Sequence, residues 1–131
     1  MKGLALSQPW AELLVSGKKK IETRNKNTNY RGWFYVYACR KGTNEKTVKS
    51  FGFESLPVGF IIGKAFLKDV KRYNSLAEFA ADVKLHLATE KELKAEGWTA
   101  KMPKYGYMIS EAKRVKALPF RGMPGFFNVD L

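Results

Sequence analysis

The sequence is poor in the residues that build disulfides and metal sites: its 131 residues include one cysteine, Cys39, and one histidine, His86. A lone cysteine excludes an intrachain disulfide, which is typical of a reducing compartment, and we expect a cytoplasmic protein. A structural zinc site needs about four cysteine or histidine ligands, so we expect no metal and no cofactor. His86 falls in a segment with a helical pattern, and we expect it on the helix surface rather than in a catalytic triad.

Long apolar runs and linkers are missing as well. No run of about 18 apolar residues is present, so the sequence predicts no transmembrane helix and no membrane partner. Residues 1–7 have neither a long apolar core nor a small-residue cleavage site, and we predict no signal peptide. No linker, internal repeat or low-complexity segment divides the chain, so we expect a single domain over residues 1–131, and a monomer.

Positive charge, in contrast, is in excess. The sequence has 24 Lys and Arg against 12 Asp and Glu, a net charge of +12. The excess is concentrated, because residues 17–49 hold ten Lys or Arg and only two Glu. Although many charge runs are simply solvated surface, a patch of this strength favours a polyanionic partner, most often nucleic acid.

Hydrophobic periodicity predicts a mixed α+β domain. Short stretches rich in β-branched and aromatic residues predict strands at residues 3–6, 18–24, 32–39, 57–70, 105–110, 114–118 and 125–129. Helical spacing and capping residues predict helices that run from Ser7 to Gly17, from a cap at Thr43 or Asn44, from Ser75 to Leu87, and from Thr89 to Gly97. Short strands with glycine bends and a few helices are typical of a small barrel. We expect Trp33, in the most apolar strand, to lie in its core.

The stretch from Gly17 to Arg24 combines cations with a carboxylate. Residues two apart share a face of a strand, so Glu22 and Arg24 are expected side by side as a charge-assisted pair. A regular strand would point Lys19 away from both of them. We expect the strand to begin irregularly beside Gly17, which brings Lys19 to the same side.

This stretch and several others resemble the ASCH domain, a family of the PUA-like superfamily of RNA-associated domains. The family signature G-x-K-x-x-E-x-R is matched by Gly17, Lys19, Glu22 and Arg24. The resemblance also rests on Gln8-Pro9-Trp10, Tyr30-Arg31-Gly32, Pro57-Val58-Gly59 with Ile62-Gly63, and the closing stretch from Pro119 to Phe127. It implies a small PUA-like β-barrel of five or six mostly antiparallel strands, with three or four helices around it and a cleft beside the motif.

From the resemblance and the charge, we expect this cleft to bind RNA, single-stranded nucleic acid or a modified nucleoside. Cations suit phosphates, and aromatic faces can stack a splayed base. The side chains expected to bind are Trp10, Lys18, Lys19, Lys20, Glu22, Arg24, Tyr30, Arg31 and Arg40. The sequence leaves open whether the ligand is RNA, DNA or a free nucleoside.

Catalysis is an open alternative. Some ASCH proteins hydrolyse an acetylated cytidine and others act as ribonucleases, and the deacylating relatives use a lysine, a threonine and a glutamate together. By resemblance Lys19 is that lysine, but Glu22 stands at the threonine position, and Thr23 is expected on the opposite strand face. A nucleophilic hydroxyl must lie within reach of its base, and no glutamate in residues 78–96 can be matched to the family's. A different chemistry would use Glu22 as a general base, with Lys19 stabilising the developing negative charge.

A third hypothesis is a protein-interaction adaptor. Its contact surface would be formed by the aromatic residues Trp98, Tyr105 and Tyr107. The same residues suit ordinary strand packing, and this hypothesis leaves the positive charge unexplained.

Overall fold

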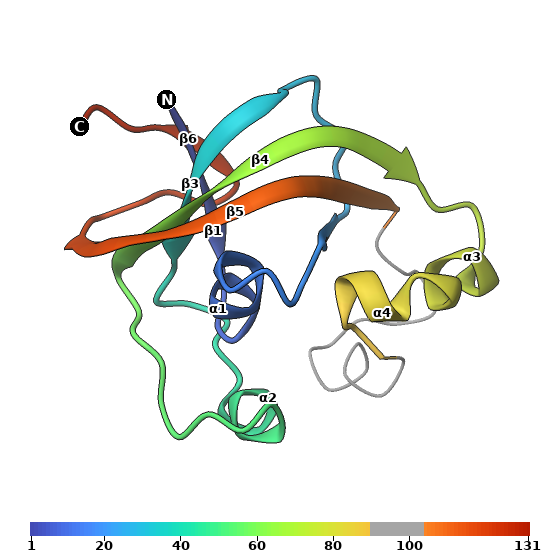
Figure 1. The fold of residues 1–131 in the computed structure, drawn as a ribbon, viewed down its shortest axis with the longest axis horizontal. Helices are drawn as coiled ribbons and strands as arrows, with labels where there is room; N and C mark the ends of the chain where they lie inside the picture. The colour runs from blue at the N-terminus through green and yellow to red at the C-terminus, as the bar shows by residue number, and fades with distance from the viewer. Residues whose placement is uncertain (90–103) are drawn as a thin grey trace.

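Six strands form one mixed sheet that curls into a half-barrel (Figure 1). The structure is a computed structural model that describes residues 1–89 and 104–131. The strands are β1 (Lys2–Leu6), β2 (Ile21–Arg24), β3 (Gly32–Ala38), β4 (Phe60–Arg72), β5 (Tyr105–Pro119) and β6 (Phe126–Asn128). Their order in the sheet is β2-β5-β4-β3-β1-β6, and only β1 and β3 are a parallel pair. The expected α+β barrel of mostly antiparallel strands is therefore confirmed.

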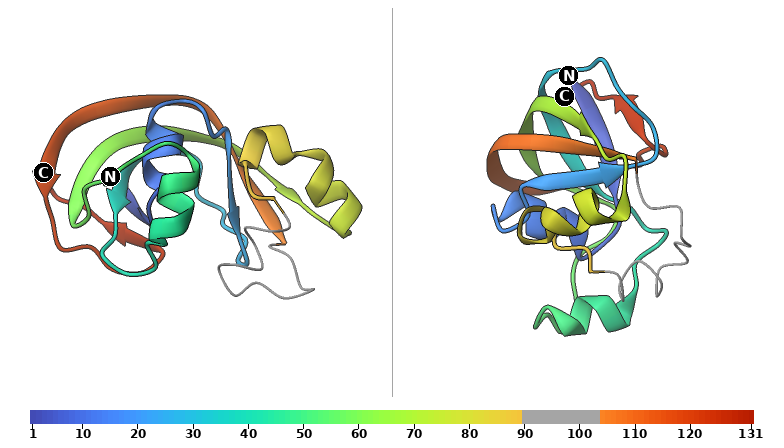
Figure 2. Two further views of the ribbon diagram at one scale, coloured as in Figure 1. Left: turned by 90° about the horizontal axis from the view of Figure 1, so that it is seen from below. Right: turned by 90° about the vertical axis from the view of Figure 1, so that its right-hand side faces the viewer.

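The long antiparallel pair of β4 and β5 forms the arch of the half-barrel (Figure 2). The sequence predicted two strands at 105–110 and 114–118, and this prediction is wrong because β5 is continuous. Register shifts against β4 between Phe66 and Leu67, and between Leu67 and Asp69, let the strand bend without ending. Bulges of this kind increase local twist and curvature.

Four short helices are described: α1 (Trp10–Val15), α2 (Glu45–Ser50), α3 (Leu76–Ala81) and α4 (Val83–His86). The side chain of Asn44 caps α2 by accepting from the amides of Lys46 and Thr47. Ser75 caps α3 in the same way, through the amide of Glu78. No described helix is long and apolar enough to cross a membrane. The helix predicted from Thr89 to Gly97, and Trp98, lie outside the described residues.

The helix predicted from Ser75 to Leu87 is broken in two, and the break lies at Asp82. The carboxylate of Asp82 accepts hydrogen bonds from Lys71 Nζ at 2.7 Å and from Tyr73 Oη at 2.6 Å. These contacts bind the junction to the end of β4. Local periodicity could not show them, because their partners lie outside the helical segment.

Helix α1 packs against the concave side of the sheet. Trp10, Leu13 and Leu14 are buried there together with Phe34 and Val36 of β3. In Figure 2, α1 and α2 lie beneath the arch of β4 and β5, while α3 and α4 lie beyond its end. A second cluster, Ala5, Tyr37, Ile61, Phe127 and Val129, joins the C-terminal segment to the other face of the sheet.

Trp33 is not in the core, which corrects the expectation from the sequence. It is partly exposed, whereas its neighbour Phe34 is fully buried in the concave core. Since successive strand residues point to opposite faces, Trp33 projects from the convex face. Because β3 is apolar on both faces, its sequence does not show which of its residues face the core.

Candidate functional site

The turn between α1 and β2 places the motif residues. Gly17 adopts a left-handed φ of +82° after the helix, a conformation that glycine enters without steric penalty. The amide of Lys19 then donates to the carbonyl of Leu13 at 2.9 Å, and β2 begins only at Ile21. The strand therefore starts irregularly, as expected. Lys19 turns inward, while Lys18 and Lys20 stay exposed.

Three charged side chains meet behind this turn. Lys19 Nζ lies 3.6 Å from Glu22 Oε1, and Arg24 Nε donates to Glu22 Oε2 at 2.9 Å. Lys19 is only 2% exposed and Glu22 7%. The carboxylate of Glu22 thus pairs with two cations. We call Lys19, Glu22 and Arg24 the ion cluster.

Lys19 also connects two helices to the ion cluster. Its Nζ donates to the main-chain carbonyl of His86 at 2.8 Å, at the end of α4. The same ammonium lies 5.2 Å from the centroid of the Trp10 ring, at the start of α1. Cation–π contacts of this kind strengthen when they are desolvated. The buried lysine is therefore held from α1, β2 and α4 at once.

Trp10 is itself nearly buried, with 8% of its surface exposed. Its ring meets the Phe51 ring edge to face, with centroids 5.6 Å apart. In this conformation the ring contributes to the site through its contact with Lys19. The stacking of a base on Trp10 stays a prediction.

His86 is fully buried, so its predicted place on a helix surface is wrong. Its Nδ1 accepts from the amide of Ala88 at 3.0 Å, which leaves Nε2–H to donate to the carbonyl of Phe79 at 2.7 Å. The imidazole stacks on the Phe79 ring, with centroids 4.0 Å apart. Burial lowers the pKa of His86 below its ordinary value, because the charged form would lose its solvation.

Arg24 connects β2 with β1, two strands that are not neighbours in the sheet. Its guanidinium donates to the carbonyl of Ala5 on β1, although β2 and β1 are separated by three strands in the sheet order. A side chain therefore closes the barrel across its interior. This contact fixes Arg24, which in turn orients Glu22.

Tyr107 of β5, which is not among the side chains expected to bind, lies directly opposite Glu22 in the register. Its hydroxyl donates to the carbonyl of Lys26 at 2.6 Å, and its ring stacks with Phe126. Burial raises the pKa of Tyr107, and the nearby charge of Arg24 partly opposes this shift. Tyr107 is thus a neutral, fixed neighbour of the ion cluster.

Gln8, the first residue of the Gln8-Pro9-Trp10 stretch, holds the start of α1 in place. Its side chain is fully buried. Its Oε1 accepts from the amide of Glu12 at 3.0 Å, and its Nε2 donates to the carbonyl of Pro57 at 3.0 Å. Gln8 thereby fixes the start of α1, where Trp10 meets Lys19.

The other predicted binding residues lie apart from the ion cluster. The Tyr30 hydroxyl donates to the carbonyl of Trp33, and its ring packs on Phe126. Arg31 is exposed, and its NH2 lies 3.5 Å from Asp69 Oδ1. Arg40 is also exposed. Within residues 1–89 and 104–131, neither arginine forms a hydrogen bond or ion pair with the ion cluster.

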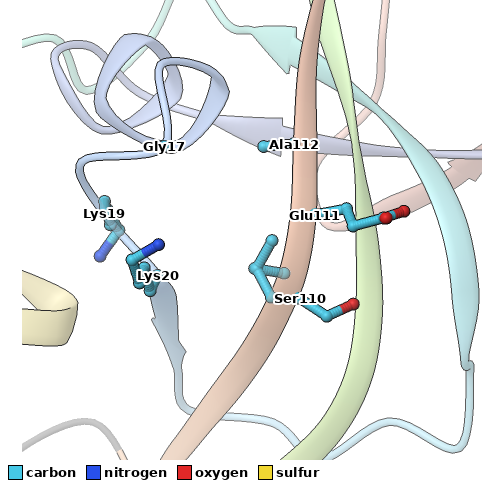
Figure 3. Close-up of a pocket in the computed structure, with 7 residues that line it drawn as sticks. Gly17, Lys19, Lys20, Ser110, Glu111 and Ala112 are labelled. Atoms are coloured by element: carbon cyan, nitrogen blue, oxygen red, sulfur yellow. The ribbon is translucent and has the colours of Figure 1, made fainter.

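A small pocket lies between the α1–β2 turn and β5 (Figure 3). The amide of Ile109 donates to the carbonyl of Lys20 at 2.9 Å, and beyond this bond the turn and the strand diverge. The pocket is lined by Gly17, Lys19, Lys20, Ile109, Ser110, Glu111 and Ala112. In the described part of the chain, no group of three His, Cys, Asp or Glu side chains could hold a metal ion.

Comparison with known proteins agrees with the resemblance found in the sequence. A family model described as the ASCH domain matches residues 4–117. No curated protein matches the sequence.

Solved structures give the same result for the fold. The crystal structure of ASCH from Zymomonas mobilis has a TM-score of 0.72 and 15% identity, and the match covers 98% of this chain and 87% of that one. A tyrosine-to-phenylalanine variant of the Zymomonas mobilis protein has a TM-score of 0.73 and 13% identity, with 98% and 89% covered. At these identities the likeness is one of fold.

Proposed function

The chain belongs to the ASCH domain family, and we propose that it binds RNA or another single-stranded nucleic acid, or a modified nucleoside, beside the Gly17–Arg24 segment. The observation that carries this proposal is the ion cluster. Replacing buried ion pairs by apolar groups of similar volume is often neutral or stabilising. Fold stability therefore gives little reason to bury Lys19 against Glu22, whereas a site that recognises a polar ligand does.

The surroundings of the ion cluster also suit a polyanion. Lys18 and Lys20 flank the buried Lys19 and are both exposed. The whole chain carries a net charge of +12, which attracts nucleic acid at long range. In the proposed complex the exposed lysines contact phosphates and position the strand, and Glu22 accepts from a base amino group.

Salt dependence tests this proposal. Each phosphate neutralised on a single strand steepens the dependence of log affinity on log salt by about 0.7. Binding of a fluorescent single-stranded RNA, measured by anisotropy at several salt concentrations, should show this dependence for the wild-type protein. A DNA oligonucleotide and free nucleosides, tested in parallel, distinguish the three ligand classes.

A matched pair of double variants locates the contacts. Lys18→Ala with Lys20→Ala should lower the slope by about 1.4, because two phosphate contacts are lost. Lys46→Ala with Lys49→Ala removes the same charge from exposed positions on α2, and should change the slope less. RNA and DNA affinities of the wild-type protein that do not vary with salt, together with no binding of free nucleosides, would overturn the proposal.

A second candidate function is hydrolysis of RNA or of an acylated cytidine nucleoside. The observation that favours it is the 3.6 Å separation of Lys19 Nζ and Glu22 Oε1 in a buried site. Glu22 would take the proton of the attacking water or 2′-hydroxyl, and Lys19 would stabilise the negative charge that develops on the substrate oxygen. The P–O5′ bond of RNA or the amide C–N bond of the nucleoside would then break, and the protonated Glu22 would give its proton to the leaving oxygen or amine. Thr23 pairs with Gly106 and lies on the strand face opposite Glu22, so a threonine-dependent amide hydrolysis is not supported.

Hydrolysis is tested with the single-stranded RNA and with an acetylated cytidine nucleoside. Glu22→Gln and Lys19→Ala should each abolish cleavage of RNA or release of acetate, while Lys46→Ala, at an exposed position on α2, should keep the wild-type rate. A Lys19→Ala protein as active as wild type would remove Lys19 from the mechanism. A wild-type protein that binds but never cleaves would leave binding as the function.

A further inference from the structure

The convex face of the sheet carries a second group of cations and aromatic rings. Trp33 on β3 and Phe66 on β4 are opposite each other in the register, and their rings meet edge to face with centroids 5.5 Å apart. In the next row on the same face of the sheet, Lys64 of β4 is opposite Lys113 of β5. We call Trp33, Lys64, Phe66 and Lys113 the outer patch. Figure 2 shows α1 and α2 beneath the arch of β4 and β5, on the side opposite the convex face.

Both lysines of the outer patch lie against one indole ring. Lys64 Nζ is 5.1 Å and Lys113 Nζ is 5.5 Å from the centroid of Trp33. Trp33 and Lys64 are partly exposed, and Lys113 is exposed. The ring and both ammonium groups are therefore within reach of a ligand.

The arrangement is unfavourable for the sheet alone. Like charges directly opposite each other on neighbouring strands are destabilising. Neither Lys64 nor Lys113 forms a salt bridge within the described chain. Glu111, the nearest carboxylate along this face of β5, is opposite Phe66 instead. Departures from such local rules are expected at functional sites, and an anion would relieve this one.

We propose that the outer patch is a second contact for single-stranded nucleic acid, in which a base stacks on Trp33 and phosphates lie on Lys64 and Lys113. This inference rests on the proposed function. Stacking on an aromatic side chain with cations beside it is how single strands bind without sequence preference. The charge of the outer patch is complementary to this ligand.

The outer patch also continues from the first site. Glu111 lines the small pocket together with Lys20, and it lies two residues from Lys113 on the same face of β5. Figure 3 shows the Lys20 and Glu111 positions on the two sides of this pocket. A single-stranded nucleic acid that contacts Lys18 and Lys20 would therefore cross β5 to reach Trp33.

The test measures the affinity and salt slope for a single-stranded RNA of about a dozen nucleotides. Lys64→Ala with Lys113→Ala should lower the slope by about 1.4, since two phosphates lose their partners. Lys68→Ala with Lys116→Ala removes equal charge from exposed positions on the same two strands, and should keep nearly the wild-type slope. Trp33→Leu should weaken binding about tenfold, the effect of losing one stacked base.

One further variant is expected to gain affinity, a result that misfolding cannot produce. Glu111→Gln removes the carboxylate beside the proposed phosphate path, and should tighten binding. Binding by wild type with no difference between the two lysine pairs overturns this inference and leaves the proposed function standing. A wild-type protein that binds no single-stranded nucleic acid overturns both. A concentration-dependent dimer that is lost in Lys64→Ala with Lys113→Ala would show that a second copy covers the outer patch, and would also overturn the inference.

Discussion

The ammonium group of Lys19 donates a hydrogen bond to the main-chain carbonyl of His86, with 2.8 Å between the two atoms. A second bond runs beside it, from the amide of Lys20 to the carbonyl of Leu85, also at 2.8 Å. The turn after α1 and the end of α4 are thus joined by polar contacts, one of them from a buried cation. The motif lysine is for this reason part of the fold as well as of the candidate site.

Replacing Lys19 should lower the stability of the protein. Lys19→Met keeps the length of the side chain but removes the ammonium, which leaves the His86 carbonyl and one oxygen of Glu22 without this partner. Breaking a buried ion pair costs about 3 kcal/mol, and Arg24 still neutralises Glu22. We therefore expect the free energy of unfolding, measured with urea, to fall by about 2–3 kcal/mol. The exposed Lys18→Met should change it by less than about 0.5 kcal/mol, and equal effects at the two positions would contradict the structure.

Stability should fall on mild acidification, because of His86. Its folded-state pKa is lowered by burial, so below about pH 6.5 the unfolded chain binds a proton that the folded chain does not. The contribution of neutral, buried His86 to the free energy of unfolding is fully present above the pKa that His86 has in the unfolded chain. It is lost as the pH falls below that pKa. The free energy of unfolding should decrease by up to about 1.4 kcal/mol per pH unit in this window.

His86→Gln is the matching variant for the pH measurement. It should be less stable at pH 7, because the bonds to Ala88 and Phe79 are lost or weakened. Its stability between pH 7 and 5 should be nearly constant. A variant with the same slope as wild type would assign the pH dependence to other groups.

The contacts of Asp82 should control the docking of α3 and α4. Hydrogen bonds from Lys71 and Tyr73 lower the pKa of the Asp82 carboxyl below its ordinary 3.8. Tyr73→Phe removes one of these donors, and hydrogen bonds to charged groups contribute about 2 kcal/mol. We expect that loss in the free energy of unfolding and, by NMR titration, a rise in the Asp82 pKa. Lys84→Ala, at an exposed position on α4, serves as the control, with little expected change.

Much of the fold follows from local sequence signals. Gly17 ends α1 in a left-handed conformation, Asn44 and Ser75 cap helices, and the strands lie near their predicted places. Each of these features depends on residues within a few positions, where backbone sterics and hydrogen bonding decide the conformation. The irregular start of β2 could be predicted for the same reason, since it follows the glycine directly.

The features of the fold and the site that could not be predicted depend on contacts between segments that are distant in the sequence. His86 is buried because α4 docks on β2 and Phe79 supplies a ring, and no local pattern distinguishes this from a solvated helix. The split at Asp82 depends on Tyr73 and Lys71 at the end of β4. The ion pair of Arg31 with Asp69 of β4 also joins segments that are distant in the sequence, and the binding role of Arg31 stays a prediction.

A methyl group at Gly63 should push α1 away from the sheet. Gly63 lies on β4 opposite Val36, and a Cβ there would stand 2.6 Å from Val15 Cγ2 and 2.5 Å from the carbonyl oxygen of Lys113. Overpacking of this kind costs about 1–3 kcal/mol, and we expect Gly63→Ala to lower the free energy of unfolding by at least that amount.

The double-mutant cycle with Val15→Ala shows which contact is responsible. Val15→Ala alone leaves a cavity under α1 and should destabilise by about 1–2 kcal/mol. In the double variant the shorter side chain makes room for the new methyl, so its loss of stability should be smaller than the sum of the two single losses. The clash with the Lys113 carbonyl remains, because a backbone atom cannot be trimmed, and the rescue should be partial. Strictly additive losses would mean that α1 does not pack against Gly63.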